Sequence, residues 1–176
     1  MSENDTQKTL VVLKPDAVQR GIIGEIISRF ERAGLKIIAM KLIAPSDEHF
    51  HKHYEEIGTL ISRHGKEVYD VTVAAMVESP VIAMVLEGVE AIPHVRKMVG
   101  ATDPKEAAPG TIRGDFTHIS RAKAIEHGRT LPNLIHASAT PEEAKQEISL
   151  WFEETELLDY KTPHQETVHG WVPKES

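Results

Sequence analysis

Four apolar segments, each followed by a stretch of helical character, constrain the fold of this chain more than any other feature. They cover residues 9–14, 35–44, 81–88 and 133–136. Their β-branched and aliphatic residues, bounded by proline, glycine or polar residues, are typical of buried strands. Because 176 residues suffice for one well-packed core and are few for two, we expect a single domain spanning residues 1–176.

Helical patterns occupy much of the chain between these segments. Residues 20–34 and 89–100 each place apolar side chains at helical spacing. Ser46 is a favourable N-cap for a helix over residues 47–58. Residues 59–79 lack a clean period and are expected to be helical only in part.

The best-marked helix start in the chain is Thr140. Thr140 is a favourable N-cap, Pro141 occupies the first helical position, and Glu143 can complete a capping box. This helix is expected to run to about Phe152.

The order of the elements favours a ferredoxin-like α/β sandwich. The strands and helices follow one another as βαββαβ, with a helical insert after the second strand and helices covering a four-stranded antiparallel sheet. A doubly wound parallel sheet is the competing architecture. It usually has more strands and a glycine-rich phosphate loop, and the sequence contains no such loop.

Three segments lie outside the predicted core. Residues 101–116 are rich in turn-forming residues and form a long loop of the kind that often carries function. Residues 117–132 are polar and basic, and we expect them to leave the core as an excursion. Residues 161–176 form a polar, extended C-terminal tail, whose Trp171 could dock on a neighbouring molecule.

Composition excludes several classes of function. The formal net charge of −7 argues against a general polyanion-binding surface, so no specific nucleic-acid partner is expected. The absence of cysteine excludes disulfides, thiol nucleophiles and cysteine-ligated metals. The N-terminus is polar and acidic, and no apolar run approaches the roughly 18 residues that a membrane span requires. We therefore expect a cytoplasmic protein with no membrane partner.

Four cations at element ends or in loops are candidates for phosphate binding: Lys14, Arg20, Arg96 and Arg113. The planar guanidinium matches two phosphate oxygens, and lysine adds a point charge. Taken singly, each of these cations is more typical of a solvated surface charge than of a phosphate-binding residue. Arg113 is the strongest candidate, because the glycines and proline around it allow the backbone to approach a ligand closely.

His136 stands between the fourth strand and the helix that Thr140 begins. The first amides of that helix favour an anion, and a neutral imidazole is a competent nucleophile because its reference pKa is about 6.5. Ser138 can hydrogen-bond to a phosphate oxygen or to the helix end. Glu147 can hold one ring nitrogen and leave the other to attack. The non-catalytic alternatives are that His136 is a structural histidine and that Glu147, judged from helical periodicity, is an exposed glutamate.

A second group of histidines suggests a different chemistry. His49 and His53 would share one helix face and could hold a metal together with a carboxylate, while His51 would point away. The sequence marks no third ligand. An exposed helix with several histidines is therefore the preferred interpretation.

Four motifs together closely resemble the nucleoside diphosphate kinases. They are "LKPDAVQRGIIGEII", "PGTIRGDF", "NLIHAS" and "EEAKQEISLWF", in this order along the chain. The resemblance covers residues 8–160, and runs of this length are far more specific than one short motif.

The resemblance implies a ferredoxin-like fold, usually assembled as homo-hexamers or homo-tetramers. It also implies ping-pong transfer of the terminal phosphate from a nucleoside triphosphate, typically ATP, to a nucleoside diphosphate through a phosphohistidine. Mg²⁺ would be carried on the nucleotide phosphates, with no direct ligand from the protein.

Matched residue by residue, the resemblance assigns roles to named positions. His136 would be the nucleophile, supported by Glu147 and Ser138, with Tyr54 beside it. The residues that would hold the nucleotide are Lys14, which would also assist catalysis, Arg96, Thr102, Arg113 and Asn133.

Three departures from the family pattern concern the site. Ala139 stands where an aspartate normally follows the serine. The stretch before the third strand is longer than usual, and the phenylalanine that normally stacks on the base has no clear counterpart, so Val68 or Tyr69 would replace it. Residues 117–132 are extended by about ten residues compared with the short spacing typical of the family.

The extension carries Arg121, Lys123 and Arg129, and it could alter either nucleotide access or subunit contacts.

A non-catalytic nucleotide-binding or scaffolding relative is the alternative function, and a metal-binding module is a third. The joint presence of the nucleophile, the cations and the orienting carboxylate favours the enzyme, since a scaffold does not need that set.

Overall fold

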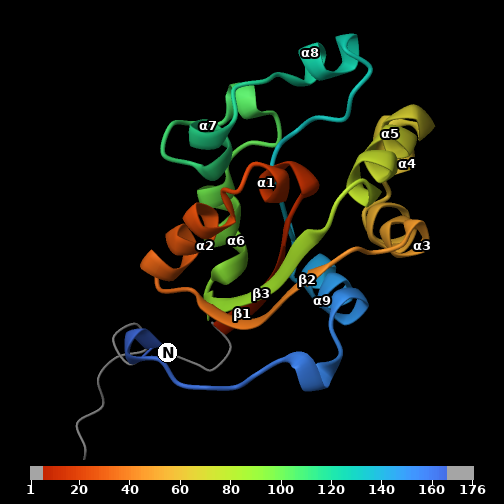
Figure 1. The fold of residues 1–176 in the computed structure, drawn as a ribbon. Helices are drawn as coiled ribbons and strands as arrows, with labels where there is room; N and C mark the ends of the chain where they lie inside the picture. Colours follow the sequence, from red (N-terminus) through yellow and green to blue (C-terminus); the bar gives the residue numbers. More distant parts are fainter. Residues whose placement is uncertain (1–5, 166–176) are drawn as a thin grey trace, which may run out of the picture.

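A computed structural model of the chain describes residues 6–165 (Figure 1). Its sheet has four strands: β1 (Thr6–Leu13), β2 (Lys36–Ile43), β3 (Val81–Val89) and β4 (Ile135–Ala137). The strand order is β2-β3-β1-β4, and every neighbouring pair is antiparallel. This arrangement confirms the predicted ferredoxin-like sandwich and excludes the doubly wound parallel sheet.

The helices vary widely in length. The α-helices are α1 (Pro15–Gln19), α2 (Ile23–Arg32), α3 (Asp47–His51), α4 (Leu60–His64), α5 (Lys66–Val77), α6 (Ala91–Val99), α7 (Ile112–Phe116), α8 (Arg121–Glu126) and α9 (Pro141–Trp151). A π-helical segment, Lys52–Ile57, continues α3, and two 3₁₀ turns occupy Pro104–Glu106 and Glu154–Glu156.

The sheet is buried on both faces, which explains why β1 reads as a continuous apolar run. Alternate residues of a strand point to opposite faces. Val11 and Leu13 therefore pack with Phe30 of α2 in one core cluster, while Leu10 and Val12 pack with Phe50 of α3 in the other. Figure 1 shows α2 and α6 on one side of the sheet and α3 and α9 on the other. Strand β1 is thus held between two apolar layers.

Short helices appear where the sequence predicts loops. Pro15 begins α1 directly after β1, where a break was expected. In the segments 101–116 and 117–132, single side chains start each turn: Thr111 accepts a hydrogen bond from the Gly114 amide, and Ser120 accepts one from the Lys123 amide. Helices of five or six residues are too short to produce a visible apolar period, so only their caps mark them.

The fourth strand begins later than predicted. Leu134 adopts a positive φ of 68°, which turns the chain before β4 starts at Ile135. Within β4, His136 pairs with Val12 of β1. The strand therefore presents His136 beside the end of β1, close to Lys14.

The cap of α9 is nearly the one predicted. The Thr140 side chain accepts a hydrogen bond from the Glu143 amide, as expected. The Glu143 carboxylate accepts a hydrogen bond from the amide of Ala139 (2.8 Å) rather than from that of Thr140. The second bond of the predicted capping box is therefore shifted by one residue.

After α9 the chain returns along β2. The Leu158 amide donates to the Ile38 carbonyl (2.8 Å), and the buried Lys36 ammonium donates to the Tyr160 carbonyl (2.6 Å). The tail predicted over 161–176 lies outside the described residues from 166 onward, as does Trp171. Among residues 6–165, no helix is long and apolar enough to span a membrane.

Candidate active site

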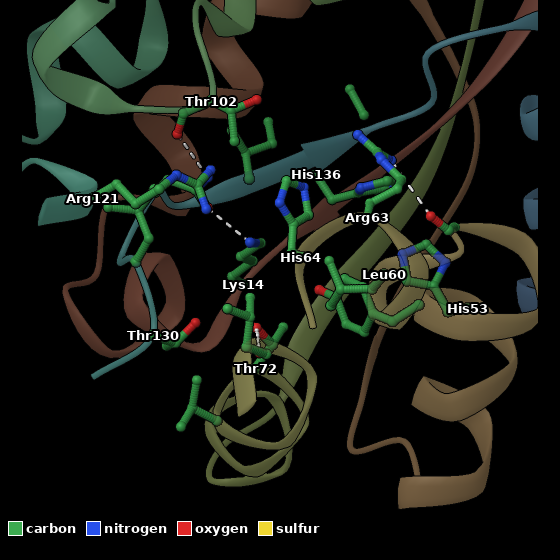
Figure 2. Close-up of a pocket in the computed structure, with 18 of the residues that line it drawn as sticks. Lys14, His53, Leu60, Arg63, His64, Thr72, Thr102, Arg121, Thr130 and His136 are labelled. Atoms are coloured by element: carbon green, nitrogen blue, oxygen red, sulfur yellow. Dashed lines mark hydrogen bonds between the residues drawn. The ribbon is translucent and has the colours of Figure 1, made fainter. Parts of the chain in front are cut away.

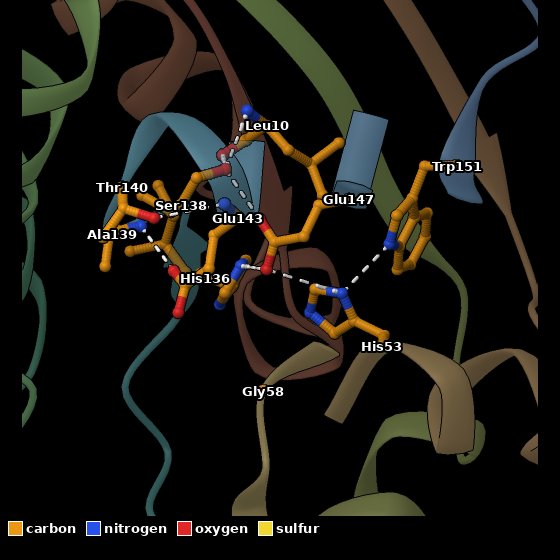
Figure 3. A network of polar contacts seen from close by, with 12 residues as sticks. Leu10, His53, Gly58, His136, Ser138, Ala139, Thr140, Glu143, Glu147 and Trp151 are labelled. Carbon is orange, nitrogen blue, oxygen red and sulfur yellow. Dashed lines mark hydrogen bonds and ion pairs between the residues drawn. The ribbon is translucent and has the colours of Figure 1, made fainter. Parts of the chain in front are cut away.

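His136 lies on β4 with one ring nitrogen bound inside the protein. Its Nε2 is 2.7 Å from Oε1 of Glu147, which projects from α9. The His136 side chain is 23% exposed, whereas that of Glu147 is 3% exposed. Figure 3 shows that the other ring nitrogen, Nδ1, points away from the carboxylate. One nitrogen is therefore held, and the other remains accessible.

Glu147 is buried, so the interpretation of an exposed glutamate from helical periodicity is wrong. Burial alone would raise the pKa of its carboxyl group, but His136 and the hydroxyl of Ser138 outweigh this and lower the pKa to about 2. Glu147 is thus ionised at neutral pH. The carboxylate fixes the proton of a neutral His136 on Nε2 and leaves the Nδ1 lone pair unprotonated.

Ser138 holds Glu147 rather than a phosphate. Its hydroxyl donates to Oε2 of Glu147 (2.6 Å) and accepts from the Leu10 amide (3.1 Å). The side chain is fully buried and does not line the pocket described below. The expectation of a bond from Ser138 to a phosphate oxygen or to the helix end is therefore wrong.

His53 belongs to the same network, which the sequence did not reveal. Its Nδ1 accepts from the Trp151 indole N–H (3.2 Å) and lies 3.7 Å from Oε1 of Glu147 (Figure 3). Its ring meets the His136 ring edge-on, with centroids 4.5 Å apart. Burial, reinforced by His136, lowers the pKa of His53 to about 3, so the ring stays neutral.

The prediction of an exposed helix with several histidines is thus only partly correct. His51 is exposed and bonds to the Tyr69 hydroxyl (2.8 Å), but His53 is buried in the site. The group with metal-ligand spacing in the described part of the chain is His53, His136 and Glu147, within 4.8 Å of one another, and does not include His49. These atoms already bond to one another or to Trp151. The sequence placed His53 on one helix face with His49 and next to Tyr54, but it did not connect His53 with His136.

Lys14 leaves β1 beside His136 and joins two further predicted residues. Its ammonium donates to Oδ1 of Asn133 (2.7 Å), whose amide donates to the Thr102 carbonyl (3.0 Å). Burial, followed by the charge of Arg113, lowers the pKa of Lys14 to about 8, although Asp16 opposes the shift. Lys14 therefore remains mostly protonated at neutral pH, although its proton is held less tightly.

Arg113 of α7 ties three backbone segments together. Its guanidinium donates to the carbonyls of Gly100 (3.0 Å), Asn133 (3.1 Å) and Ile135 (2.6 Å). Burial and the neighbouring Arg96 lower its pKa to about 10, so it stays charged at neutral pH. Arg113 thus brings positive charge to the site and also anchors the start of β4.

A pocket of about 260 Å³ opens beside His136 (Figure 2). The predicted residues that line it are Lys14, Tyr54, Val68, Arg96, Thr102, Arg113, Asn133, His136 and Glu147. Arg20 is not brought into this pocket, since it donates to the Phe116 carbonyl (2.6 Å) instead. Tyr69 does not line it either, so of the two candidates for base stacking only Val68 lines the pocket.

The pocket has two ends. We call the part around His136, Lys14 and Arg113 the inner end, and the part formed by α4, α5 and α8 the outer end. At the inner end, the buried hydroxyl oxygen of Tyr54 has no hydrogen-bond partner within residues 6–165. Burial and nearby carboxylates raise the pKa of Tyr54, so its proton is available for donation.

The sequence of the chain was compared with those of known protein families. The family model described as nucleoside diphosphate kinase matches residues 7–157. The chain belongs to the nucleoside diphosphate kinase family. The family, the fold and the phosphotransferase class predicted from the sequence are thereby confirmed.

Individual family members match over nearly the whole chain. The nucleoside diphosphate kinase of Borreliella burgdorferi is 46% identical over 155 residues, covering 88% of this chain and 92% of that protein. The enzyme of Pyrococcus horikoshii is 50% identical over 157 residues, covering 89% and 92%.

Solved structures of the family also superimpose closely. A transition state mimic of the Borrelia burgdorferi enzyme, with bound vanadate and ADP, matches with a TM-score of 0.91 and 43% identity, covering 95% of this chain and 99% of that chain. The Halobacterium salinarum enzyme in complex with CDP has a TM-score of 0.79 and 38% identity, covering 92% and 97%.

Ala139, in the position of the aspartate expected from the resemblance, lines the pocket. A carboxylate is still present at this corner, because Glu143 also lines the pocket and binds the Ala139 amide. Its anchor is the backbone amide of Ala139, which any residue other than proline at that position would supply.

Proposed function

We propose that this chain transfers the terminal phosphate of a nucleoside triphosphate, typically ATP, to a nucleoside diphosphate by ping-pong through a phosphohistidine at His136. The observation that carries the proposal is the partly buried hydrogen bond of 2.7 Å between Glu147 and Nε2 of His136. This bond leaves Nδ1 as the nucleophile, directed toward a pocket lined with cations. The related structure with vanadate and ADP supports the same chemistry here.

In the first half-reaction, the Nδ1 lone pair forms a bond to the terminal phosphorus. The bond from that phosphorus to its bridging oxygen breaks, and the diphosphate leaves with the bonding electrons. No proton has to move, because the Nε2 proton stays hydrogen-bonded to Glu147. The ring gains positive charge as the N–P bond forms, and the carboxylate stabilises that charge. The second half-reaction reverses these steps with a different diphosphate.

The cations at the inner end stabilise the negative charge on the phosphates. A phosphoryl group in transfer spreads its charge over its oxygens, so catalysis depends on positioned cations and in-line geometry. We assign Lys14, Arg96, Arg113 and the Thr102 side chain to the phosphates. Asn133 would contact the sugar hydroxyl and the phosphate region. The unpartnered Tyr54 hydroxyl is suited to donate to an oxygen of a phosphate on His136.

The residues of the pocket suit Mg²⁺ carried by the nucleotide. Of the two carboxylates that line the pocket, Glu147 is committed to His136 and Ser138, and Glu143 binds the Ala139 amide. Neither makes a dedicated cage, so phosphate oxygens would supply the ligands. A Mg²⁺ ion bound with the nucleotide would supply positive charge that neutralises part of the charge on the phosphates, beside Lys14, Arg96 and Arg113.

We also propose that the chain acts as a cytoplasmic homo-hexamer or homo-tetramer. Its edge strand β2 exposes Met40 (53%) and Leu42 (61%), an apolar pair that another copy could cover. The lack of cysteine is consistent with a reducing compartment. Light scattering coupled to size exclusion measures the assembly directly, and a monomer would contradict this part of the proposal.

One labelling experiment separates the enzyme from a non-catalytic relative. The protein is incubated with γ-labelled ATP and Mg²⁺, isolated, and mixed with an unlabelled diphosphate of another base. We expect acid-labile label on the protein that moves to the acceptor, and no label on His136→Ala. A wild-type protein that retains no label, or a His136→Ala variant that labels equally well, would contradict the mechanism.

A further inference from the structure

Two short helices form opposite walls of the outer end of the pocket. Helix α4 lines it with Leu60, Arg63 and His64, and α8 lines it with Arg121, Ala124 and Ile125. Each set has the spacing i, i+3, i+4, so each is one helical face. Figure 2 shows Arg121 entering near Thr102 and Lys14, while Leu60 and Arg63 stand on the other side. The extension therefore contributes to the substrate pocket itself.

The remaining charged residues of α8 face away from the pocket. Lys123 forms an ion pair with Glu126 (2.6 Å), and both side chains are well exposed. Neither lines the pocket beside His136. Helix α8 thus places its two cations on different sides, with Arg121 facing the pocket and Lys123 facing solvent.

Arg121 has no counter-ion within residues 6–165, whereas six other cations in this range form ion pairs with carboxylates. The cations that form ion pairs with carboxylates are Arg29, Lys36, Lys41, Lys52, Lys66 and Lys123. Arg121 instead faces other positive groups. After burial, it is the main cause that lowers the pKa of His64, and it adds to burial and Arg113 in lowering that of Lys14. An anion in the pocket would relieve this repulsion.

The position of Arg121 indicates which part of an anion it would meet. His136 lies at the inner end, so the terminal phosphate must lie there during transfer. Arg121 comes from the outer wall and is an electrostatic neighbour of Lys14. A nucleotide entering between α4 and α8 would therefore bring its non-transferred phosphates past Arg121.

We propose that Arg121 is a nucleotide-binding residue that contacts the phosphates remaining on the diphosphate, and that α8 forms a substrate wall rather than a subunit contact. This inference rests on the proposed function. It adds to the family's phosphate cations a residue supplied by the segment that is extended in this chain. Its role is binding, so it affects the affinity for nucleotide and not the reactivity of His136.

The substitution Arg121→Ala tests this directly. The Arg121 backbone amide donates to Oδ2 of Asp103 (3.0 Å), and this bond at the start of α8 does not depend on the side chain. We expect the Kd for ADP, measured by calorimetry, to rise about tenfold, the lower range for a charged hydrogen bond at a half-exposed site. Lys123→Ala, which removes the same charge from the same helix, should leave Kd within about twofold.

Phosphorylation by phosphoramidate, a donor without a nucleoside, separates the two proposals. Arg121→Ala should accept phosphate on His136 from this donor at the wild-type rate, and Arg121→Lys should recover part of the ADP affinity. An unchanged Kd in Arg121→Ala, or an equal rise in Lys123→Ala, would overturn the role of Arg121 while leaving the phosphohistidine intact. If the wild-type protein takes up no phosphate on His136, the proposed function itself fails.

Discussion

The inner and outer ends of the pocket are built on different principles. At the inner end, Lys14, Asn133, His136 and Glu147 are held by bonds to one another and lie on or next to β1, β4 and α9. At the outer end, the walls include two helices of five and six residues, whose pocket-facing cations have no ion pairs among residues 6–165. The difference teaches that the groups around His136 are preorganised by the core, whereas the proposed contacts with the rest of the nucleotide depend on local segments.

The largest effect is expected from Glu147→Gln at the inner end. The amide retains the volume but removes the charge that stabilises the ring as the N–P bond forms. We expect the rate of phosphoenzyme formation, measured by rapid quench, to fall about 100-fold or more, with the Kd for ADP unchanged. Glu142→Gln, an exposed carboxylate on the same helix, is the control. A loss confined to Kd would mean that the inner end binds rather than orients.

Lys14→Met should have the next largest effect. It removes a charge bonded to Asn133 and leaves Oδ1 of that residue without its donor. We expect the Kd for ADP to rise about 30-fold, within the range for a charged hydrogen bond. Lys8→Met removes the same charge from an exposed position on β1 and should change little. Equal effects of the two substitutions would show that only the overall charge matters.

The pH dependence of ADP binding tests the same lysine without a substitution. The pKa of Lys14 is lowered to about 8, so its charge is present below pH 8 and is lost as the pH rises through that value. Anion binding needs the charge, so affinity should fall about tenfold between pH 7 and pH 9. In Lys14→Met this loss should be absent. A fall of the same size in that variant would assign the titration to another group.

The smallest effect is expected at the outer end. Val68→Ala removes two methyl groups from the pocket wall, and because the site is open we expect KM for the nucleotide to rise about threefold with kcat unchanged. Tyr69→Ala is the matched control, since Tyr69 binds His51 outside the pocket. If Val68→Ala lowered kcat instead, the outer end would be part of the catalytic machinery and the contrast between the two ends would fail.

Much of the architecture could be predicted because its causes are local. The strands are continuous apolar runs since both faces of the sheet are covered, and Thr140 with Pro141 marks the start of α9 in the sequence. His136 and three of the four candidate cations, Lys14, Arg96 and Arg113, line the pocket, since phosphate chemistry requires those residue types near turns, whereas Arg20 lies elsewhere. The strands and the start of α9 were therefore anticipated, whereas the short helices α1, α7 and α8 were not.

The rest depends on contacts between distant segments. Helical periodicity placed Glu147 at the boundary of the apolar stripe, and only the packing of α9 against β1 and the Lys52–Ile57 segment decides that it is buried beside His136. His53 becomes part of the site because Trp151, 98 residues later, donates to it. Leu134 turns the chain through a positive φ that no pattern in the sequence signals.

The return of the chain along β2 limits how copies of this protein can pair. An edge strand offers free amides and carbonyls that recruit strands from other molecules and lead to open-ended aggregation. Leu158 and Tyr160 already occupy the carbonyls of Ile38 and Ile37, at the start of β2. Among residues 6–165, the other half of this edge carries the exposed Met40 and Leu42. If copies pair through β2, we expect them to meet at this half, and the C-terminal segment to disfavour open-ended growth.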